Sequence, residues 1–160
     1  MYRQLEDNDA SDCIALMKKS WHDNEGYSVG YQEKNEVSWI LHLTKHLSEA
    51  PNNPHFFTQG AWSDEGKLKG FFLASTFTNY YNGQFTMDVK DCIIDQDIGN
   101  TSFVAVRFFD SMFEHMKKYD GEYWRADSVR TYDNCEKYAE FLCKRYNATA
   151  SLSMRGKLEV

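Results

Sequence analysis

The feature that most constrains the fold is a run of three strand-like segments that leads directly into a strongly amphipathic helix. Residues 55–62, 68–80 and 84–94 are rich in aromatic, Thr and β-branched side chains, which favour strands. Asp64-Glu65-Gly66 and Asn82-Gly83 separate the three segments and are typical of hairpin turns. The sequence therefore predicts an antiparallel meander in the middle of the chain.

The helix after the meander has the clearest periodicity in the sequence. Its apolar side chains recur at i, i+3, i+4, i+7, i+8 and i+11, on one helix face: Ala105, Phe108, Phe109, Met112, Phe113 and Met116. We interpret this face as core packing rather than a cofactor site, because such a stripe is the ordinary signature of a buried helix face.

Two further helices are predicted before the meander. A short extended start at residues 2–5 precedes a helix marked by Ile14, Met17 and Trp21, and a second helix runs from about residue 36 to about residue 49.

Three more elements are predicted after the amphipathic helix. Residues 123–129 are strand-like, residues 133–136 have the form of a capping box before a helix, and residues 148–158 return as a strand. The predicted order of elements is β-α-α-β-β-β-α-β-α-β.

Length and charge limit the class of protein. The 160 residues fit one domain and contain no repeat or linker, so we expect residues 1–160 to form a single domain. The formal charge of -6 disfavours nucleic acid as a partner. No window approaches the roughly 18 apolar residues of a membrane span, and no signal peptide is visible. We expect a cytoplasmic protein whose four cysteines are reduced thiols, and no membrane partner.

The junction between the last meander strand and the amphipathic helix is the best candidate for a binding site. It reads Gln96-Asp97-Ile98-Gly99-Asn100-Thr101-Ser102 and follows the apolar strand end Cys92-Ile93-Ile94. Unpaired amides at a helix start carry the positive end of the helix dipole, so they bind phosphate groups without basic side chains, and Gly allows close approach. The alternative is a simple turn in which Thr101 or Ser102 caps the helix.

The element order and this junction together make the chain resemble the GNAT acyltransferase family, as a divergent member. The family places a Q/R-x-x-G-x-G/A loop between its fourth strand and third helix, and this chain has Gln96-x-x-Gly99-x-Thr101 there. The resemblance covers almost the whole chain. It implies an α+β fold: a mixed, mostly antiparallel twisted sheet flanked by about four helices.

The resemblance also implies acetyl-CoA, or another acyl-CoA, as cosubstrate. The loop would bind its pyrophosphate through backbone amides, and the preceding strand would pair with its pantetheine arm. The cosubstrate-binding residues that follow from this are Cys92, Ile93, Ile94, Gln96, Ile98, Gly99, Asn100, Thr101, Ser102 and, in a second partial match, Asn134. In that second match Leu142 stands where the family has a Tyr that protonates the departing thiolate. Tyr138, one turn earlier, is the substitute acid, or else a core residue.

Two carboxylates on the fourth strand are the candidates for the general base. Asp88 and Asp91 lie on the strand before the loop. A carboxylate at this place, beside the acyl group, could accept a proton directly or through water. Their opposite parity predicts that they face opposite sides of the strand, so at most one faces the site. For each of them the alternative is an ordinary surface carboxylate.

Other side chains complete the list of candidates. His42 and His46 have two-ligand spacing, but no third ligand is identifiable and we assign no metal. Trp21, Tyr27, Tyr31 and Trp39 occupy the region that covers the acceptor in the resembled family, and either line a pocket or pack in the core.

Our first hypothesis is an acyl-CoA-dependent N-acyltransferase in which a primary amine of a small molecule or peptide attacks the acyl group directly. The alternative is a catalytically inactive GNAT-like binding or assembly protein, encoded by a virus. The sequence identifies neither the acceptor nor the oligomeric state, and a homodimer is one of the states that stay open.

Overall fold

The computed structural model describes residues 1–22, 33–78, 83–119, 121–126 and 135–149. The chain divides into two compact units, Met1–Asp127 and Ser128–Val160, and each is described by itself. That residues 1–160 form a single domain therefore stays a prediction.

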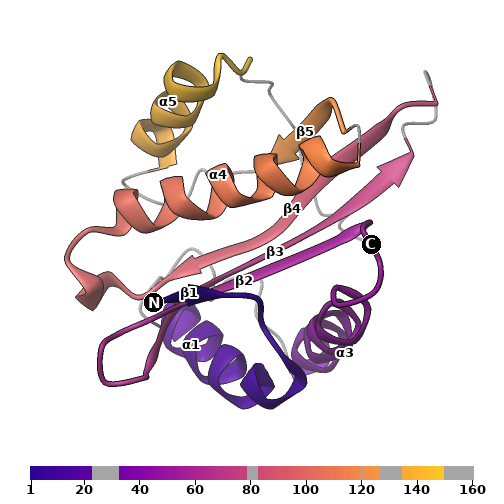
Figure 1. Cartoon of the computed structure of the whole chain (residues 1–160). Coiled ribbons are helices and arrows are strands. Elements are labelled where there is room, and N and C mark those ends of the chain that lie inside the picture. Colours follow the sequence, from indigo (N-terminus) through magenta and orange to yellow (C-terminus); the bar gives the residue numbers. More distant parts are fainter. Residues whose placement is uncertain (23–32, 79–82, 120, 127–134, 150–160) are drawn as a thin grey trace, which may run out of the picture. The chain divides into compact units, whose positions relative to one another are not determined.

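Among the described residues, the first unit contains one five-stranded sheet (Figure 1). The strands lie in chain order: β1 (Tyr2–Arg3), β2 (Phe56–Trp62), β3 (Leu68–Thr78), β4 (Phe85–Ile94) and β5 (Tyr123–Ala126). Neighbouring strands pair antiparallel except for β4 and β5, which are parallel. The predicted meander and the mixed, mostly antiparallel sheet are confirmed.

Helices of the first unit cover both faces of this sheet (Figure 1). The short 3-10 helix η1 (Asp7–Asp9) leads into α1 (Ala10–His22), which packs with α3 (Glu33–Glu49) on one face. On the other face lies α4 (Thr101–Lys118), and a second 3-10 helix, η2 (Gln96–Ile98), joins β4 to it. None of the described helices is both long enough and apolar enough to cross a bilayer.

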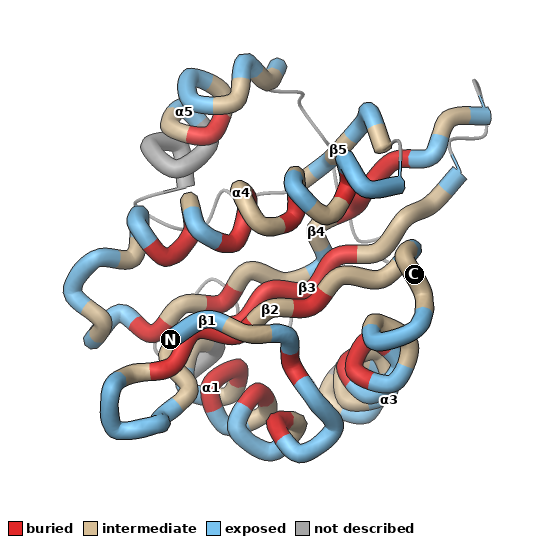
Figure 2. The backbone as a smooth tube through the Cα atoms, viewed as in Figure 1, coloured by how far each residue is buried: buried red, intermediate tan, exposed pale blue. Residues whose placement is uncertain are grey.

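The core lies on both sides of β3, which is buried through its middle at residues 70–74 (Figure 2). On the α1 and α3 side, Phe71 and Leu73 belong to one buried apolar cluster. On the α4 side, the Phe72 ring lies 5.7 Å from the Phe108 ring and 5.2 Å from the Phe109 ring. The predicted core stripe of α4 is buried at Ala105, Phe108, Phe109, Met112 and Met116, and half-buried at Phe113.

An irregularity in β4 changes which side of the sheet its side chains face. Asp88 pairs with Ser75 of β3, and Asp91 pairs with Leu73, so three steps along β4 match two steps along β3. The extra residue is Lys90, and the irregularity is a β-bulge. Ser75 and Leu73 are two residues apart and face the same side of the sheet, so their partners do too. The predicted opposite facing of Asp88 and Asp91 is therefore wrong.

The second unit contains α5 (Cys135–Tyr146), at the position where a helix was predicted. Asn147 ends it with a left-handed backbone (φ 50°), and the Ala148 N–H donates to the Cys143 carbonyl at 3.0 Å. The strand predicted at residues 148–158 lies outside the described residues, apart from its first two.

Candidate active site

The junction between β4 and α4 forms a loop with a defined backbone. Asp95 is the N-cap of η2, and Gly99 follows with a left-handed φ of 77°. The Asn100 side chain accepts a hydrogen bond from the Phe103 N–H at 3.1 Å and so caps α4. The alternative, in which Thr101 or Ser102 caps the helix, is wrong about the cap, because α4 begins at Thr101 and the cap is the residue before it.

This loop is open at the residues that were predicted to bind pyrophosphate. Four of them are exposed, namely Gln96, Gly99, Asn100 and Ser102. The other two, Ile98 and Thr101, are half-buried. A Cβ atom added to Gly99 would meet no atom within 4 Å, so a ligand has free space at this backbone. The first amides of a helix have no partner within that helix. The loop therefore fits a diphosphate group bound by main-chain donors.

Asp95 anchors the loop to two other elements of the first unit. Its carboxylate, in a residue only 7% exposed, accepts hydrogen bonds from Lys19 Nζ of α1 at 2.8 Å and from Lys69 Nζ of β3 at 2.9 Å. It also accepts the Asp97 N–H at 3.1 Å. Burial raises the pKa of Asp95, but the hydrogen bonds from Lys19 and Lys69 outweigh burial and lower this pKa to about 2.

The two lysines were missed by the sequence analysis, which found no basic side chain for the loop. Lys19 also pairs with the exposed Asp97 at 2.7 Å, so it touches the loop at two carboxylates. It lies 76 residues before Asp95, and no local pattern links the two positions. Only the packing of α1 beside β4 brings the lysine to the loop.

We predict that Asp95→Asn destabilises the fold by about 1 to 2 kcal/mol at pH 7, after allowing for the solvent screening of the half-exposed Lys19. The folded-state pKa of Asp95 lies below its unfolded value, so its contribution is present above about pH 4 and is lost as the pH falls toward 2. Urea unfolding of both proteins from pH 7 to pH 3 measures this. A stability difference that does not shrink toward pH 3 would contradict the assignment.

The pairing of β4 with β5 is described as far as the residue before the bulge. In the described residues this parallel ladder runs from Thr86 and Tyr123 to Val89 and Ala126, and the bulged Lys90 comes next.

The predicted strand residues of the cosubstrate site lie beyond the bulge. Ile93 is buried in the core cluster, whereas Cys92 and Ile94 are half-buried. The Asp95 N–H donates to the Lys69 carbonyl at 2.8 Å. Because hydrogen-bonding direction alternates along an antiparallel pair, the main-chain groups of Cys92 and Ile94 point away from β3. The side chain of Ile93 is buried in the core cluster, so this side chain would not contact a ligand.

Asp91 is the carboxylate beside the bulge that is suited to accept a proton. Its side chain is half-buried and accepts a hydrogen bond from Trp39 Nε1 of α3 at 3.1 Å. Burial raises the pKa of Asp91 to about 7, against the opposing effects of the Trp39 hydrogen bond and the Lys90 charge. A carboxylate that titrates near neutral pH is matched to general-base work.

Asp88 has a different environment on the same strand. It is 4% exposed and accepts two hydrogen bonds from Arg125 of β5, at 3.0 and 2.9 Å, and one from Lys90. Burial raises the pKa of Asp88, but the hydrogen bonds from Arg125 and Lys90 outweigh burial and lower it. Asp88 therefore joins β4 to β5 as a paired carboxylate, which makes it a weak proton acceptor.

Several predicted residues lie outside what the structure describes. Asn134, Tyr27 and Tyr31 are outside the described residues, and the side chains of Tyr138 and Trp21 are as well. Their roles stay predictions. Trp39 is described, and it packs against the core cluster while it reaches Asp91.

The rings of the two histidines of α3, His42 and His46, lie close together and are tilted by 55°. Their ring centroids are 4.2 Å apart, and His46 Nδ1 donates to the His42 carbonyl at 2.9 Å. Burial lowers the pKa of His46 to about 4, so the ring is neutral at pH 7. Within the described ranges, no group of three His, Cys, Asp or Glu side chains gathers to hold a metal ion.

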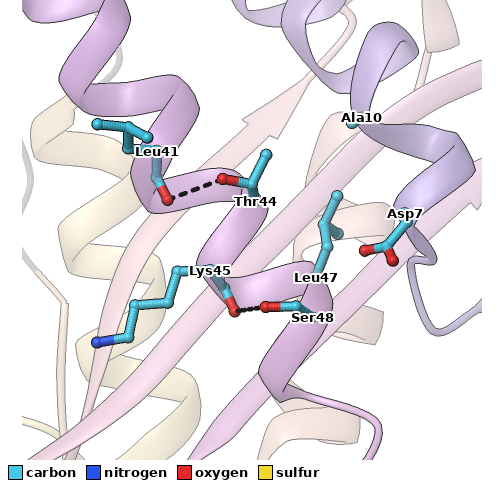
Figure 3. A pocket seen from close by; sticks show the side chains of 7 residues that line it. All are labelled: Asp7, Ala10, Leu41, Thr44, Lys45, Leu47 and Ser48. Carbon is cyan, nitrogen blue, oxygen red and sulfur yellow. Dashed lines mark hydrogen bonds between the residues drawn. The ribbon is translucent and has the colours of Figure 1, made fainter.

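A separate surface pocket lies where η1 and the start of α1 meet α3 (Figure 3). Its lining consists of Asp7, Ala10, Leu41, Thr44, Lys45, Leu47 and Ser48. The Thr44 and Ser48 hydroxyls donate to carbonyls of their own helix, those of Leu41 and Lys45. None of the predicted site residues lines this pocket, so we place the candidate site at β4 and the loop instead.

Comparisons with known proteins bear on the fold of this chain. No protein-family model matches the sequence, and no curated protein matches it either. Solved structures do match. The aminoglycoside 6'-N-acetyltransferase AAC(6')-Ih from Acinetobacter baumannii is 14% identical with a TM-score of 0.68, and the match covers 100% of this chain and 98% of that one.

Two further matches are acetyltransferases. AAC(6')-Iy, in complex with a bisubstrate analogue that contains CoA, is 13% identical with a TM-score of 0.67, and the match covers 100% of this chain and 97% of that one. A ribosomal-protein-alanine N-acetyltransferase from Brucella melitensis biovar Abortus 2308 is 15% identical with a TM-score of 0.64, and the match covers 99% of both chains. The chain therefore has the GNAT fold, with a sequence that diverges far from each of these structural neighbours.

Proposed function

We propose that this chain is an acyl-CoA-dependent N-acyltransferase that transfers an acetyl group to a primary amine of a small molecule or a peptide. One observation carries the proposal. A half-buried carboxylate, Asp91, lies at a bulge of β4, and the same strand leads into an open loop with the left-handed Gly99 at the start of α4. A proton acceptor and a diphosphate-binding loop on one strand are the two parts that this reaction requires.

The cosubstrate, acetyl-CoA, supplies the acyl group as a thioester. In this proposal the backbone N–H groups of residues 99–102 bind its pyrophosphate, and the outward main-chain groups of Cys92 and Ile94 bind its pantetheine arm. Lys19 and Lys69 hold Asp95 and thereby fix the loop. The acetyltransferase neighbours support the choice of cosubstrate, since one of them was solved with a CoA-containing analogue.

Asp91 is the base of the proposed reaction. It accepts the proton that the amine loses as the nitrogen replaces sulfur on the acyl carbon, either directly or through one water molecule. The C–S bond of the thioester breaks and CoA leaves as a thiolate, which takes a proton from solvent to become the thiol, while Asp91 returns the amine proton to solvent. Asp88 has no part in this transfer, because Arg125 and Lys90 already hold its carboxylate.

We expect the transfer rate to rise with pH through about 7, because only the ionised form of Asp91 accepts a proton. The test is an assay of CoA thiol release from acetyl-CoA with a panel of small amines and amino-terminal peptides, with mass spectrometry of the acetylated product. The proposal predicts transfer to at least one acceptor, and thiol release that matches product formation. Binding of acetyl-CoA without transfer to any member of the panel would contradict it and favour the non-catalytic binding protein.

A further inference from the structure

We infer that Trp39 is a positioning residue that orients Asp91 as the base of the transfer reaction. The inference rests on the proposed function. The indole Nε1–H of Trp39 on α3 donates to Oδ2 of Asp91 on β4 at 3.1 Å, across 52 residues of sequence. One side chain of α3 thus holds the carboxylate at the bulge.

The hydrogen-bond donor is itself held by the core. The Trp39 ring lies 6.0 Å from the ring of Phe71, at a tilt of 53°, and Phe71 is fully buried in the cluster under α1 and α3. A half-buried Trp whose ring packs on a buried Phe has few alternative rotamers. The indole N–H therefore stays directed at β4, and one oxygen of Asp91 has a fixed place relative to the strand.

The charged groups around Asp91 decide how strongly the Trp39 hydrogen bond affects its ionisation. Among the described residues, two titratable groups face it: Lys90 on its own strand and Cys13 on α1. Burial, aided by neighbouring carboxylates that include Asp91, raises the pKa of Cys13 to about 12, so this thiol is neutral and adds no charge beside Asp91. Lys90 is shared with Asp88. The Trp39 N–H is thus a donor that favours the ionised form of Asp91, which burial alone disfavours.

Trp39→Phe tests the inference, since it keeps an aromatic ring against Phe71 and removes the N–H. We expect the pKa of Asp91 to rise by about one pH unit, as for other hydrogen bonds to a charged group. At pH 7 the rate would fall about five-fold, because a smaller fraction of Asp91 is ionised, and it would recover near pH 9. The two readouts are the carboxyl carbon resonance of Asp91 in an NMR titration without substrate, and the pH profile of transfer.

Phe71→Leu is the matched control, because it loosens the packing of Trp39 without removing the N–H. It should lower the melting temperature and shift the pH profile in the same direction as Trp39→Phe but by less, because the N–H is retained. An active parent whose Asp91 titrates at the same pH after Trp39→Phe would overturn the inference. A parent that transfers no acyl group contradicts the proposed function itself, and with it the positioning role of Trp39, whatever the NMR titration shows. A shifted resonance together with a shifted pH profile supports the inference.

Discussion

Asp91→Asn is expected to lower the rate of acyl transfer by about 10²- to 10⁴-fold while the affinity for CoA stays nearly unchanged. The amide keeps the shape of the side chain and still accepts the Trp39 N–H, so the fold should survive. The Asn side chain of the variant cannot accept the proton of the amine. The parent rate should rise with pH through about 7, and the residual rate of the variant should lack this rise. Steady-state kinetics across pH 5.5 to 9 with an acceptor of the parent measures both.

Asp88→Asn is the matched control, because Asp88 lies three residues earlier on the same side of the same strand. Its carboxylate is already ionised and is held by Arg125 and Lys90, so we expect a loss of stability with the pH profile of transfer retained. The two variants separate a base from a structural ion pair. An active parent whose rate and pH profile are unchanged by Asp91→Asn would exclude this residue as the base. Water or a main-chain carbonyl would then replace it in the account.

Gly99→Asp is expected to weaken CoA binding by at least ~2 kcal/mol, or about 30-fold in the dissociation constant. Two physical reasons combine. The backbone of Gly99 is left-handed at φ 77°, which a residue with a Cβ atom adopts only at a cost. The new carboxylate would also repel a diphosphate group bound to the same amides. Isothermal titration with CoA, together with melting curves, measures the effect.

Gly99→Asn is the control for this variant, because Asn has the same size as Asp, tolerates the left-handed region and carries no charge. The affinity lost with Asp beyond that lost with Asn reports the electrostatic part. We expect that part to shrink as the salt concentration rises. Equal CoA affinity in both variants and the parent, with an intact fold, would show that the loop is only a structural turn.

Much of the fold could be predicted from the sequence, because most elements are marked by strong local patterns. The stripe from Ala105 to Met116 is a helix with a buried face, and Gly66 and Gly83 take the left-handed conformations that their hairpin turns require. The junction at Gly99 was found for the same reason, since a left-handed Gly before a helix is a local feature.

The electrostatics of the candidate site could not be predicted in this way, because they depend on contacts between distant segments. The bulge at Lys90 adds one residue without any change in composition, so strand parity placed Asp88 and Asp91 on opposite faces. The contrast between these carboxylates arises from Arg125, which comes from β5, and from Trp39, which comes from α3. Residue type and spacing identify two candidates, but only their neighbours distinguish an ion-paired carboxylate from a base.

Calorimetric titration of the parent protein with acetyl-CoA and with CoA is the first test of the proposed function, since every step of the proposed reaction requires that the cosubstrate binds. We expect both ligands to bind in the micromolar range, with about 7 to 9 kcal/mol of binding free energy. We also expect Gly99→Asp to weaken the binding of both ligands. If neither acetyl-CoA nor CoA binds at near-millimolar concentration, with the protein shown to be folded, the proposed function is contradicted before any acceptor is tested.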